Sequence, residues 1–159
     1  MTEKKNKMTL VVLSGDMDKV LAAYIIANGA AAMGMDVVMF FTFWGIKAIQ
    51  RGNLTGKSIF GRMLGMMNRG GVDAIGPSRL NMGGMGRWMF KLMMKMHGVT
   101  PLNELRKTAI DLGVRLLPCD MSMRVMEIDR ADLLPEAEEP VGVATMLEHA
   151  NESSIQYFI

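Results

Sequence analysis

The sequence is poor in the residues that build several common kinds of site. Its 159 residues include one cysteine, Cys119, and only two histidines. A single cysteine excludes an internal disulfide framework, and this cysteine usage is typical of a reducing cytoplasm. The polar start at residues 2–7 also lacks the apolar core and cleavage site of a signal peptide. We therefore expect a cytoplasmic protein.

Charge of one sign and long apolar runs are lacking as well. The 18 lysines and arginines nearly balance 16 acidic residues, so the net charge of +2 gives no reason to expect nucleic acid as the main partner. The apolar run at residues 37–43 is too short to span a membrane. The length suits one domain, residues 1–159, with a real core, and is too short for two.

Strand and helix patterns alternate along the first part of the chain. Residues 8–13 predict the first and central strand, and residues 17–33 predict a helix that stops at Gly34. Residues 37–43 predict the second strand, because β-branched and aromatic residues fill this run. Such βαβ alternation favours a parallel sheet.

The same alternation continues in the last third. Thr100 as cap and Pro101 at the first helical position predict a helix that ends at Gly113. We expect a short buried strand ended by Pro118, and the remaining elements are a surface loop at 129–140, a helix at 143–150 and an edge strand at 155–159. The fold class predicted is α/β: a small, doubly wound, mainly parallel sheet of four to five strands with helices on both faces.

Residues 46–98 form a glycine- and methionine-rich stretch that we expect to be a helical insertion in this domain. Eleven glycines interrupt its apolar groups, and nine of the 19 methionines lie between Met63 and Met96. Thioether clusters can bind copper, but only His97 stands at the edge of this one. We therefore interpret the methionines as packing material for the core or an interface, and we expect no metal and no cofactor.

Within this stretch, residues 86–96 predict an amphipathic helix. Arg87, Lys91 and Lys95 form a cationic stripe on it. The broad apolar face consists of Trp88, Met89, Leu92, Met93 and Met96. That face must be buried against the domain or a neighbouring subunit, or else lie on an anionic membrane surface as a peripheral contact.

The loop Ser14-Gly15-Asp16 follows the first strand, where nucleotide-binding folds place a phosphate loop. It has a single glycine and two nearby carboxylates, Asp16 and Asp18, which argue against phosphate. Neither G-x-G-x-x-G nor the P-loop spacing occurs here. We expect the loop to line a pocket.

Cys119 lies between a strand pattern and a helix pattern. Asp120 or Ser122 can cap the following helix, whose positive end favours the thiolate, the form that attacks sulfur. An Asp120 carboxylate turned to the sulfur would oppose ionisation. The plainer interpretation is a buried packing residue, but the carboxyl end of a strand is where open α/β sheets carry working residues.

Four segments carry a resemblance to a known family. They are Leu-Ser-Gly-Asp-Met-Asp-Lys, Met-Phe-Phe-Thr-Phe-Trp-Gly, Cys-Asp-Met-Ser-Met-Arg-Val-Met and Gly-Val-Ala-Thr-Met-Leu. Together they resemble the DsrE/DsrF/DsrH-like family of sulfur-handling proteins over residues 8–159, closest to the branch with a methionine-rich middle segment that is often labelled peroxiredoxin-like. The resemblance implies a small doubly wound sheet that assembles into homo- or hetero-oligomers. It also implies that Cys119 takes a sulfane sulfur as a persulfide and hands it to another thiol.

Two departures qualify the resemblance. Asp120 and Glu127 stand where small or neutral residues are expected, and both add negative charge near the thiol. The peroxiredoxin label finds no support, because no second cysteine can resolve a sulfenic acid and no Pro-x-x-x-Thr/Ser-x-x-Cys loop precedes Cys119.

The function expected is a sulfur carrier or sulfurtransferase-type protein in which Cys119 exchanges sulfur with donor and acceptor proteins. The supporting pocket expected consists of Asp120, Met121, Ser122, Met123, Ser14, Gly15 and Asp16. We expect a homo-oligomer. The alternative is a non-catalytic scaffolding subunit that recruits partners or membrane through its methionine-rich surface. His149 is expected to be a surface residue rather than a base, since no neighbour in sequence forms a relay with it.

Overall fold

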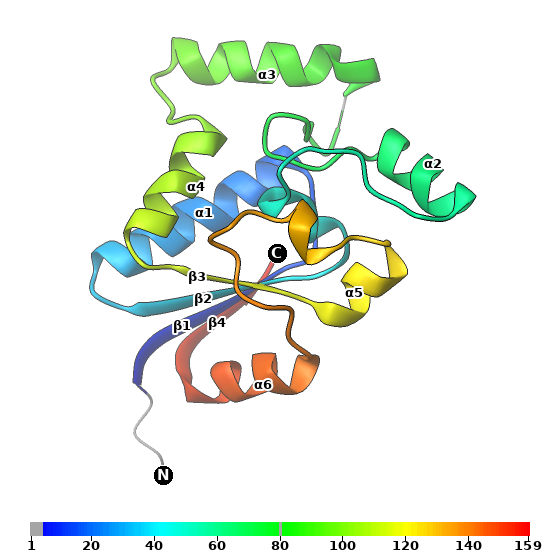
Figure 1. Cartoon of the computed structure of the whole chain (residues 1–159). Coiled ribbons are helices and arrows are strands. Elements are labelled where there is room, and N and C mark those ends of the chain that lie inside the picture. The colour runs from blue at the N-terminus through cyan, green and yellow to red at the C-terminus, as the bar shows by residue number, and fades with distance from the viewer. Residues whose placement is uncertain (1–4, 80) are drawn as a thin grey trace.

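A four-stranded, all-parallel sheet organises the computed structural model, which describes residues 5–79 and 81–159 (Figure 1). Its strands are β1 (Lys5–Val12), β2 (Asp36–Phe41), β3 (Arg115–Pro118) and β4 (Ser153–Phe158), in the order β3-β2-β1-β4. The predicted parallel α/β fold is confirmed, with β1 central and β4 at an edge. The sequence-based expectation for residues 2–4 lies outside the described residues.

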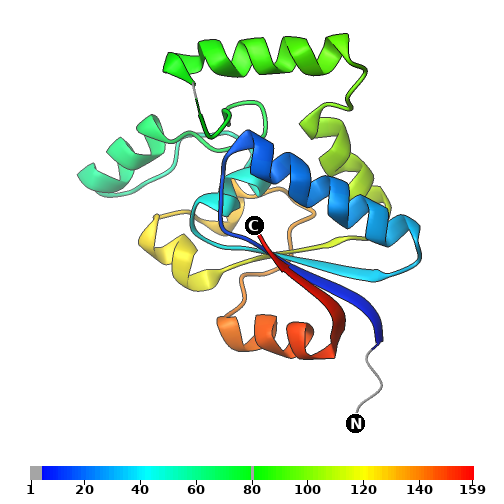
Figure 2. The ribbon, with the colours of Figure 1, turned by 180° about the vertical axis from the view of Figure 1, so that it is seen from behind.

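Helices cover both faces of this sheet. Helices α1 (Met17–Ala32) and α4 (Leu102–Asp111) pack together on one face, and α6 (Val143–Glu152) covers the other (Figures 1 and 2). This follows from the connections, because each parallel strand pair needs a crossover and the last crossover lies on the opposite side. Within the described ranges, no helix is both long and apolar enough to cross a membrane.

Alternation along the strands divides the core in two. Leu10, Met39 and Leu116 contribute to the main core under α1, whereas Val38 and Leu117 belong to a smaller cluster on the α6 side. Strands β2 and β3 read as continuous apolar runs rather than alternating ones because both of their faces are buried, whereas the edge strand β4 is largely exposed.

The glycines predicted to end helices are confirmed at two carboxyl ends, but the predicted N-cap residues are not. Gly34 and Gly113 have φ of 82° and 79° at the ends of α1 and α4, as predicted. The cap assignment was wrong at two helices: Pro101 rather than Thr100 occupies the N-cap of α4, and Cys119 itself is the N-cap of α5 (Asp120–Val125). Pro101 has extended backbone (ψ 152°), so the helix begins one residue later than its ring suggested.

The stretch 46–98 contains elements of two kinds. A 3-10 helix, η1 (Phe43–Ile49), ends the predicted second strand early and sends Ile46 and Ile49 into the main core. The helices α2 (Ile59–Met67) and α3 (Met85–Met96), with a short turn η2 (Met82–Gly84) before α3, lie farther from the sheet (Figure 1). Helix α3 confirms the predicted helix at 86–96.

Most methionines of this stretch are not buried within the chain. The exposed ones are Met63, Met66, Met67, Met82, Met85, Met89, Met93 and Met96. Their interpretation as internal packing is therefore wrong, and burial against another molecule stays a prediction. The segment at 129–140, expected to be a surface loop, holds a turn η3 (Arg130–Asp132) and also inserts Leu133 and Ala137 into the core.

The turn after β2 packs directly on the end of β1. Thr42 donates its amide to the Val12 carbonyl at 3.0 Å, and Gly45 donates to the Leu13 carbonyl at 2.9 Å. A Cβ atom on Gly45 would overlap the Val12 carbonyl oxygen. Glycine at 45 therefore lets η1 and the carboxyl edge of the sheet approach.

Glu127 connects the end of α5 to the start of α2. Its carboxylate accepts hydrogen bonds from the Lys57 amide, from the Ser58 amide at 2.7 Å and from the Ser58 hydroxyl at 2.6 Å. These bonds, the Ser58 hydroxyl first, lower the pKa of Glu127. The glutamate thus anchors α2 to the domain.

Replacement of Gly45 by alanine should destabilise the protein by about 2 kcal/mol or more, because the added methyl group meets backbone that cannot move freely. The matched control is Gly29→Ala in the exposed part of α1, where no atom lies within 4 Å of the added Cβ. That change should stabilise by about 0.5–1 kcal/mol. Urea unfolding measures both, and equal effects would refute the close-approach argument.

Replacement of Glu127 by alanine should increase amide hydrogen exchange across α2 while leaving α1 unchanged. The wild-type protein should show the same increase in exchange across α2 at acidic pH. The folded-state pKa of Glu127 is depressed, so the contribution of this carboxylate to stability is fully present above the unfolded pKa of about 4.3. That contribution is lost as the pH falls through the folded-state pKa. The control is Glu136→Ala, at an exposed carboxylate. An unchanged exchange pattern in α2 for Glu127→Ala would show that α2 is held by other contacts.

Candidate functional site

Cys119 lies at the carboxyl end of β3, as predicted. Its amide donates to the Phe41 carbonyl at 2.9 Å, which continues the pairing between β2 and β3. On its other side a single parallel bridge joins Cys119 to Val141. The Val141 amide donates to the Pro118 carbonyl at 2.9 Å, and the Val141 carbonyl accepts from the Asp120 amide at 3.0 Å.

The Cys119 side chain points to the α6 side of the sheet and is only 5% exposed. It packs with Val38, Phe40 and Leu117, and Val141 and Met146 border the same cluster. The thiol is therefore buried, and the first amide of the following helix, that of Asp120, is taken by the Val141 carbonyl rather than left free for the sulfur. The cause is tertiary, because the segment that covers the thiol, and takes up the Asp120 amide, follows much later in the sequence.

The acidic residues near Cys119 are engaged elsewhere. The Asp120 carboxylate pairs with the Arg124 guanidinium through two contacts: Oδ1 lies 3.1 Å from Nε, and Oδ2 lies 2.7 Å from Nη2. Glu127 is directed to the start of α2. The negative charge that the sequence placed beside the thiol is thus paired with Arg124 or committed to the α2 anchor.

The other residues of the predicted pocket separate. Met121 is exposed on α5, whereas Ser122 of the same helix is buried with its hydroxyl 2.8 Å from the Thr42 hydroxyl. Met123 lies in the main core, not in the cluster of Cys119, so it forms no rim around the sulfur.

The loop 14–16 also lies at the carboxyl edge but belongs to another site. Gly15 and Asp16 line a cavity of about 1050 Å³, as predicted for a pocket, while the cavity lining contains none of residues 119–123. Ser14 donates its hydroxyl to the Asp16 carboxylate at 3.0 Å and its side chain stays within the loop. The residues predicted to form one pocket around Cys119 therefore lie at two separate sites.

Sequence reasoning missed the basic residues of this cavity. Lys47 lies on η1, shortly after β2, and Arg51 follows η1. Arg69 comes from the loop after α2, and Arg106 lies on α4. The available signal was positional: polar residues after the second strand stand at the same sheet edge as residues 14–16 after the first. Arg106 gave no signal, because it lies on a helix that precedes β3.

His149 is half-buried rather than a plain surface residue. Its Nδ1 lies 2.7 Å from the ammonium of Lys7, which also pairs with Glu152 at 2.9 Å. Burial, and then Lys7, lower the pKa of His149. Across residues 5–79 and 81–159, no three histidine, cysteine or acidic side chains gather as metal ligands.

Comparisons with known proteins agree with this architecture. The chain matches the model of the DsrE/DsrF/DrsH-like family over residues 4–158. It is 42% identical to the uncharacterized protein YrkE of Bacillus subtilis over the whole of both chains. It is 29% identical to the sulfur carrier protein DsrE2 of Allochromatium vinosum over 98% of this chain and 99% of that one.

A solved structure shares the fold alone. The ychN protein of E. coli aligns over 96% of this chain and 98% of its own with a TM-score of 0.56, at 9% sequence identity. The family match covers nearly every residue from β1 to β4. The chain therefore belongs to the DsrE/DsrF/DrsH-like family.

Proposed function

We propose that this protein is a sulfur carrier in which Cys119 accepts a sulfane sulfur as a persulfide and passes it to a partner thiol. The observation that carries the proposal is the position of the single thiol at the carboxyl end of β3, in a chain whose family includes a named sulfur carrier. One cysteine suffices for this exchange.

The transfer is redox-neutral and balanced. The Cys119 thiolate attacks the outer sulfur of a donor persulfide, a new S–S bond forms at Cys119, and the donor leaves as a thiolate as its own S–S bond breaks. An acceptor thiolate then attacks the outer sulfur on Cys119, which leaves as a thiolate again. No electrons enter or leave, so neither oxidant nor cofactor is needed.

Access to the sulfur requires movement of the cover formed by Val141 and Met146. The cover has few buried contacts. Two backbone hydrogen bonds hold Val141 to Pro118 and Asp120, and Lys7 contacts His149 and Glu152 on α6. None of the ten residues of α6, all described, is fully buried. Segments with few buried contacts open at low free-energy cost. A donor that docks beside Met121 and Leu147, both exposed apolar side chains, would reach the thiol once α6 shifts.

Incubation with a persulfide donor should add the mass of one sulfur atom to the wild-type protein, and Cys119→Ser should gain none. Intact-mass spectrometry measures this, and circular dichroism confirms that the variant folds. Equal gain by both proteins would refute the carrier proposal.

Met146→Ala should increase the rate of iodoacetamide alkylation of Cys119 because it thins the cover, whereas Met33→Ala, at an exposed site remote from the thiol, should leave the rate unchanged.

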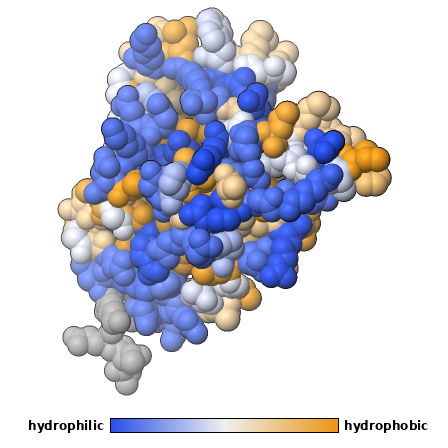
Figure 3. Space-filling model, in the orientation of Figure 1, coloured by the Kyte–Doolittle hydropathy of each residue, from blue (hydrophilic) through white to orange (hydrophobic). Residues whose placement is uncertain are grey.

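A second candidate function concerns the apolar surface of α2 and α3. This α2–α3 surface consists of exposed residues that Figure 3 shows in part, namely Ile59, Phe60, Met66, Met67, Trp88, Met89, Met93 and Met96. Ile59 is 85% and Trp88 67% exposed. So many exposed apolar side chains on two helices are typical of a contact with another molecule.

Charge distribution favours a second copy of the chain over an anionic membrane. Arg87 donates to the Ala74 carbonyl, and Lys91 lies 3.6 Å from the Asp73 carboxylate. Of the predicted stripe, Lys91 is thus paired with a carboxylate and Arg87 is turned to the cavity beside residues 14–16, so Lys95 alone remains for lipid headgroups. We therefore propose a homo-oligomer joined through the α2–α3 surface.

Trp88→Glu should shift the protein to a lower mass in size-exclusion light scattering, because a charge in an apolar contact costs more than the contact supplies. Lys107→Glu, at an exposed site on α4, should keep the wild-type mass. Flotation with phosphatidylserine vesicles tests the membrane alternative. A wild-type monomer, or vesicle binding that Trp88→Glu abolishes, would overturn the oligomer proposal.

A further inference from the structure

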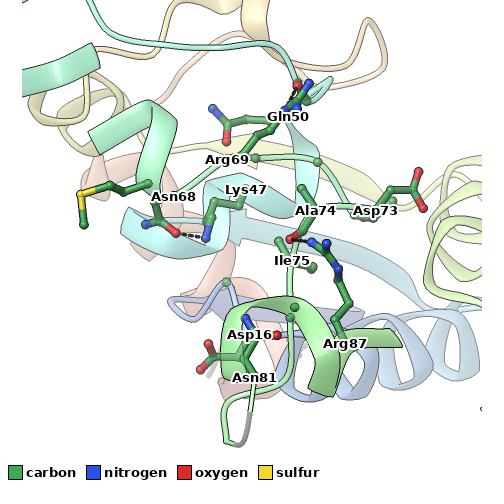
Figure 4. Close-up of a pocket in the computed structure, with 18 of the residues that line it drawn as sticks. Asp16, Lys47, Gln50, Asn68, Arg69, Asp73, Ala74, Ile75, Asn81 and Arg87 are labelled. Carbon is green, nitrogen blue, oxygen red and sulfur yellow. Dashed lines mark hydrogen bonds between the residues drawn. The ribbon is translucent and has the colours of Figure 1, made fainter. Parts of the chain in front are cut away.

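A large cavity lies on the face of the sheet opposite to Cys119. The loop after β1, the end of η1, the loop 68–77 and the start of α3 surround it, and Figure 4 shows Lys47, Asn68, Ala74 and Arg87 around the same hollow. Its volume of about 1050 Å³ is that of a site for a nucleotide-sized ligand. Arg106 on α4 and Leu134 complete the walls, so the fold rather than one motif builds the cavity.

The cavity carries an excess of unpaired positive charge. Five cations line it: Lys47, Arg51, Arg69, Arg87 and Arg106. In the described part of the chain none of the five forms an ion pair. Both carboxylates of the lining are already neutralised, Asp16 by Lys19 at 3.1 Å and Asp73 by Lys91 at 3.6 Å. The arrangement therefore favours an anion.

The arginines are held in place without being consumed. Arg51 donates its Nε to the Leu133 carbonyl at 2.7 Å, and Arg69 donates its Nε to the Gly52 carbonyl at 2.9 Å. Arg106 uses one Nη on the Ala48 carbonyl at 3.2 Å. A guanidinium has five N–H donors, so each keeps several for a ligand, in the fork geometry that matches phosphate.

A buried amide also lines the cavity. Gln50 is only 3% exposed and belongs to the cavity lining. The backbone at Gly70 lies so close that a Cβ there would overlap the Gln50 amide. Glycine at 70 therefore leaves room for this polar side chain in the basic wall of the cavity.

The absence of a glycine-rich phosphate motif is compatible with this charge pattern. The Met17 amide at the start of α1 donates to the Gly76 carbonyl at 2.8 Å, and Asp18 accepts from the amide and hydroxyl of Ser78, each at 2.8 Å. The carboxylates that argued against phosphate are therefore turned to Lys19 and Ser78. Side-chain cations, rather than helix amides, supply the binding charge.

We propose that this cavity binds a small molecule that carries at least two phosphate groups, of the size of a nucleoside diphosphate. The five cations come from five different elements or loops, so a single phosphate would reach only part of them. The cavity is separate from Cys119, which faces the α6 side of the sheet. The ligand proposal therefore does not depend on the sulfur-carrier proposal.

Isothermal titration of the full chain at low ionic strength, with ADP, pyrophosphate and inorganic phosphate as probes, tests this inference. ADP and pyrophosphate should bind, and inorganic phosphate at least tenfold more weakly. Arg69→Gln and Lys47→Gln should each weaken ADP binding tenfold or more. Arg62→Gln, an exposed arginine of α2 outside the lining, and Cys119→Ser should bind ADP like wild type.

Three results would overturn the proposal. One is no binding of either ADP or pyrophosphate. Another is equal loss in Arg62→Gln and Arg69→Gln, which would mean general charge attraction. The third is inorganic phosphate binding as tightly as pyrophosphate. Because Arg69 is exposed, Arg69→Gln should fold normally, and thermal unfolding checks this for each variant. A failed sulfur uptake by Cys119 would leave these results unaffected.

Discussion

Burial of the inner strands of the parallel sheet on both faces is the constraint on which the rest of this structure depends. In a strand with both faces covered, neighbouring side chains enter different cores. Leu116 therefore lies under α1 and Leu117 under α6, and the same alternation carries Cys119 to the α6 side. The thiol and the basic cavity share the carboxyl edge of the sheet, yet the sheet itself separates them.

The two sites differ in how they are shielded. The Cys119 cluster is apolar and closed by a segment that two backbone hydrogen bonds hold against β3. The cavity is polar and open, and its cations are positioned by backbone carbonyls rather than carboxylates. A persulfide suits the first environment, since exclusion of water and stray thiols protects it, and a multiply charged ligand suits the second.

The stretch between β2 and α4 serves both the core and the surface. Ile49 and Ile75 complete the main core, while Gln50, Arg69 and Arg87 face the cavity. Its outer faces on α2 and α3 remain apolar and exposed. Glu127 connects this outer part to the cysteine-bearing segment through Ser58, so the two regions of the chain are mechanically joined.

The sequence by itself determined the order of elements, the helix stops at Gly34 and Gly113, the amphipathic helix at 86–96 and the place of Cys119 at the end of a strand. Each of these depends on neighbours within a few residues, which is the range over which periodicity and turn chemistry act. Only the tertiary structure decided that Val141 covers the thiol, that Glu127 anchors α2 and that Arg106 joins Lys47 at one cavity. Those contacts join residues far apart in the chain, and local patterns carry no information about which distant segments meet at a sheet edge.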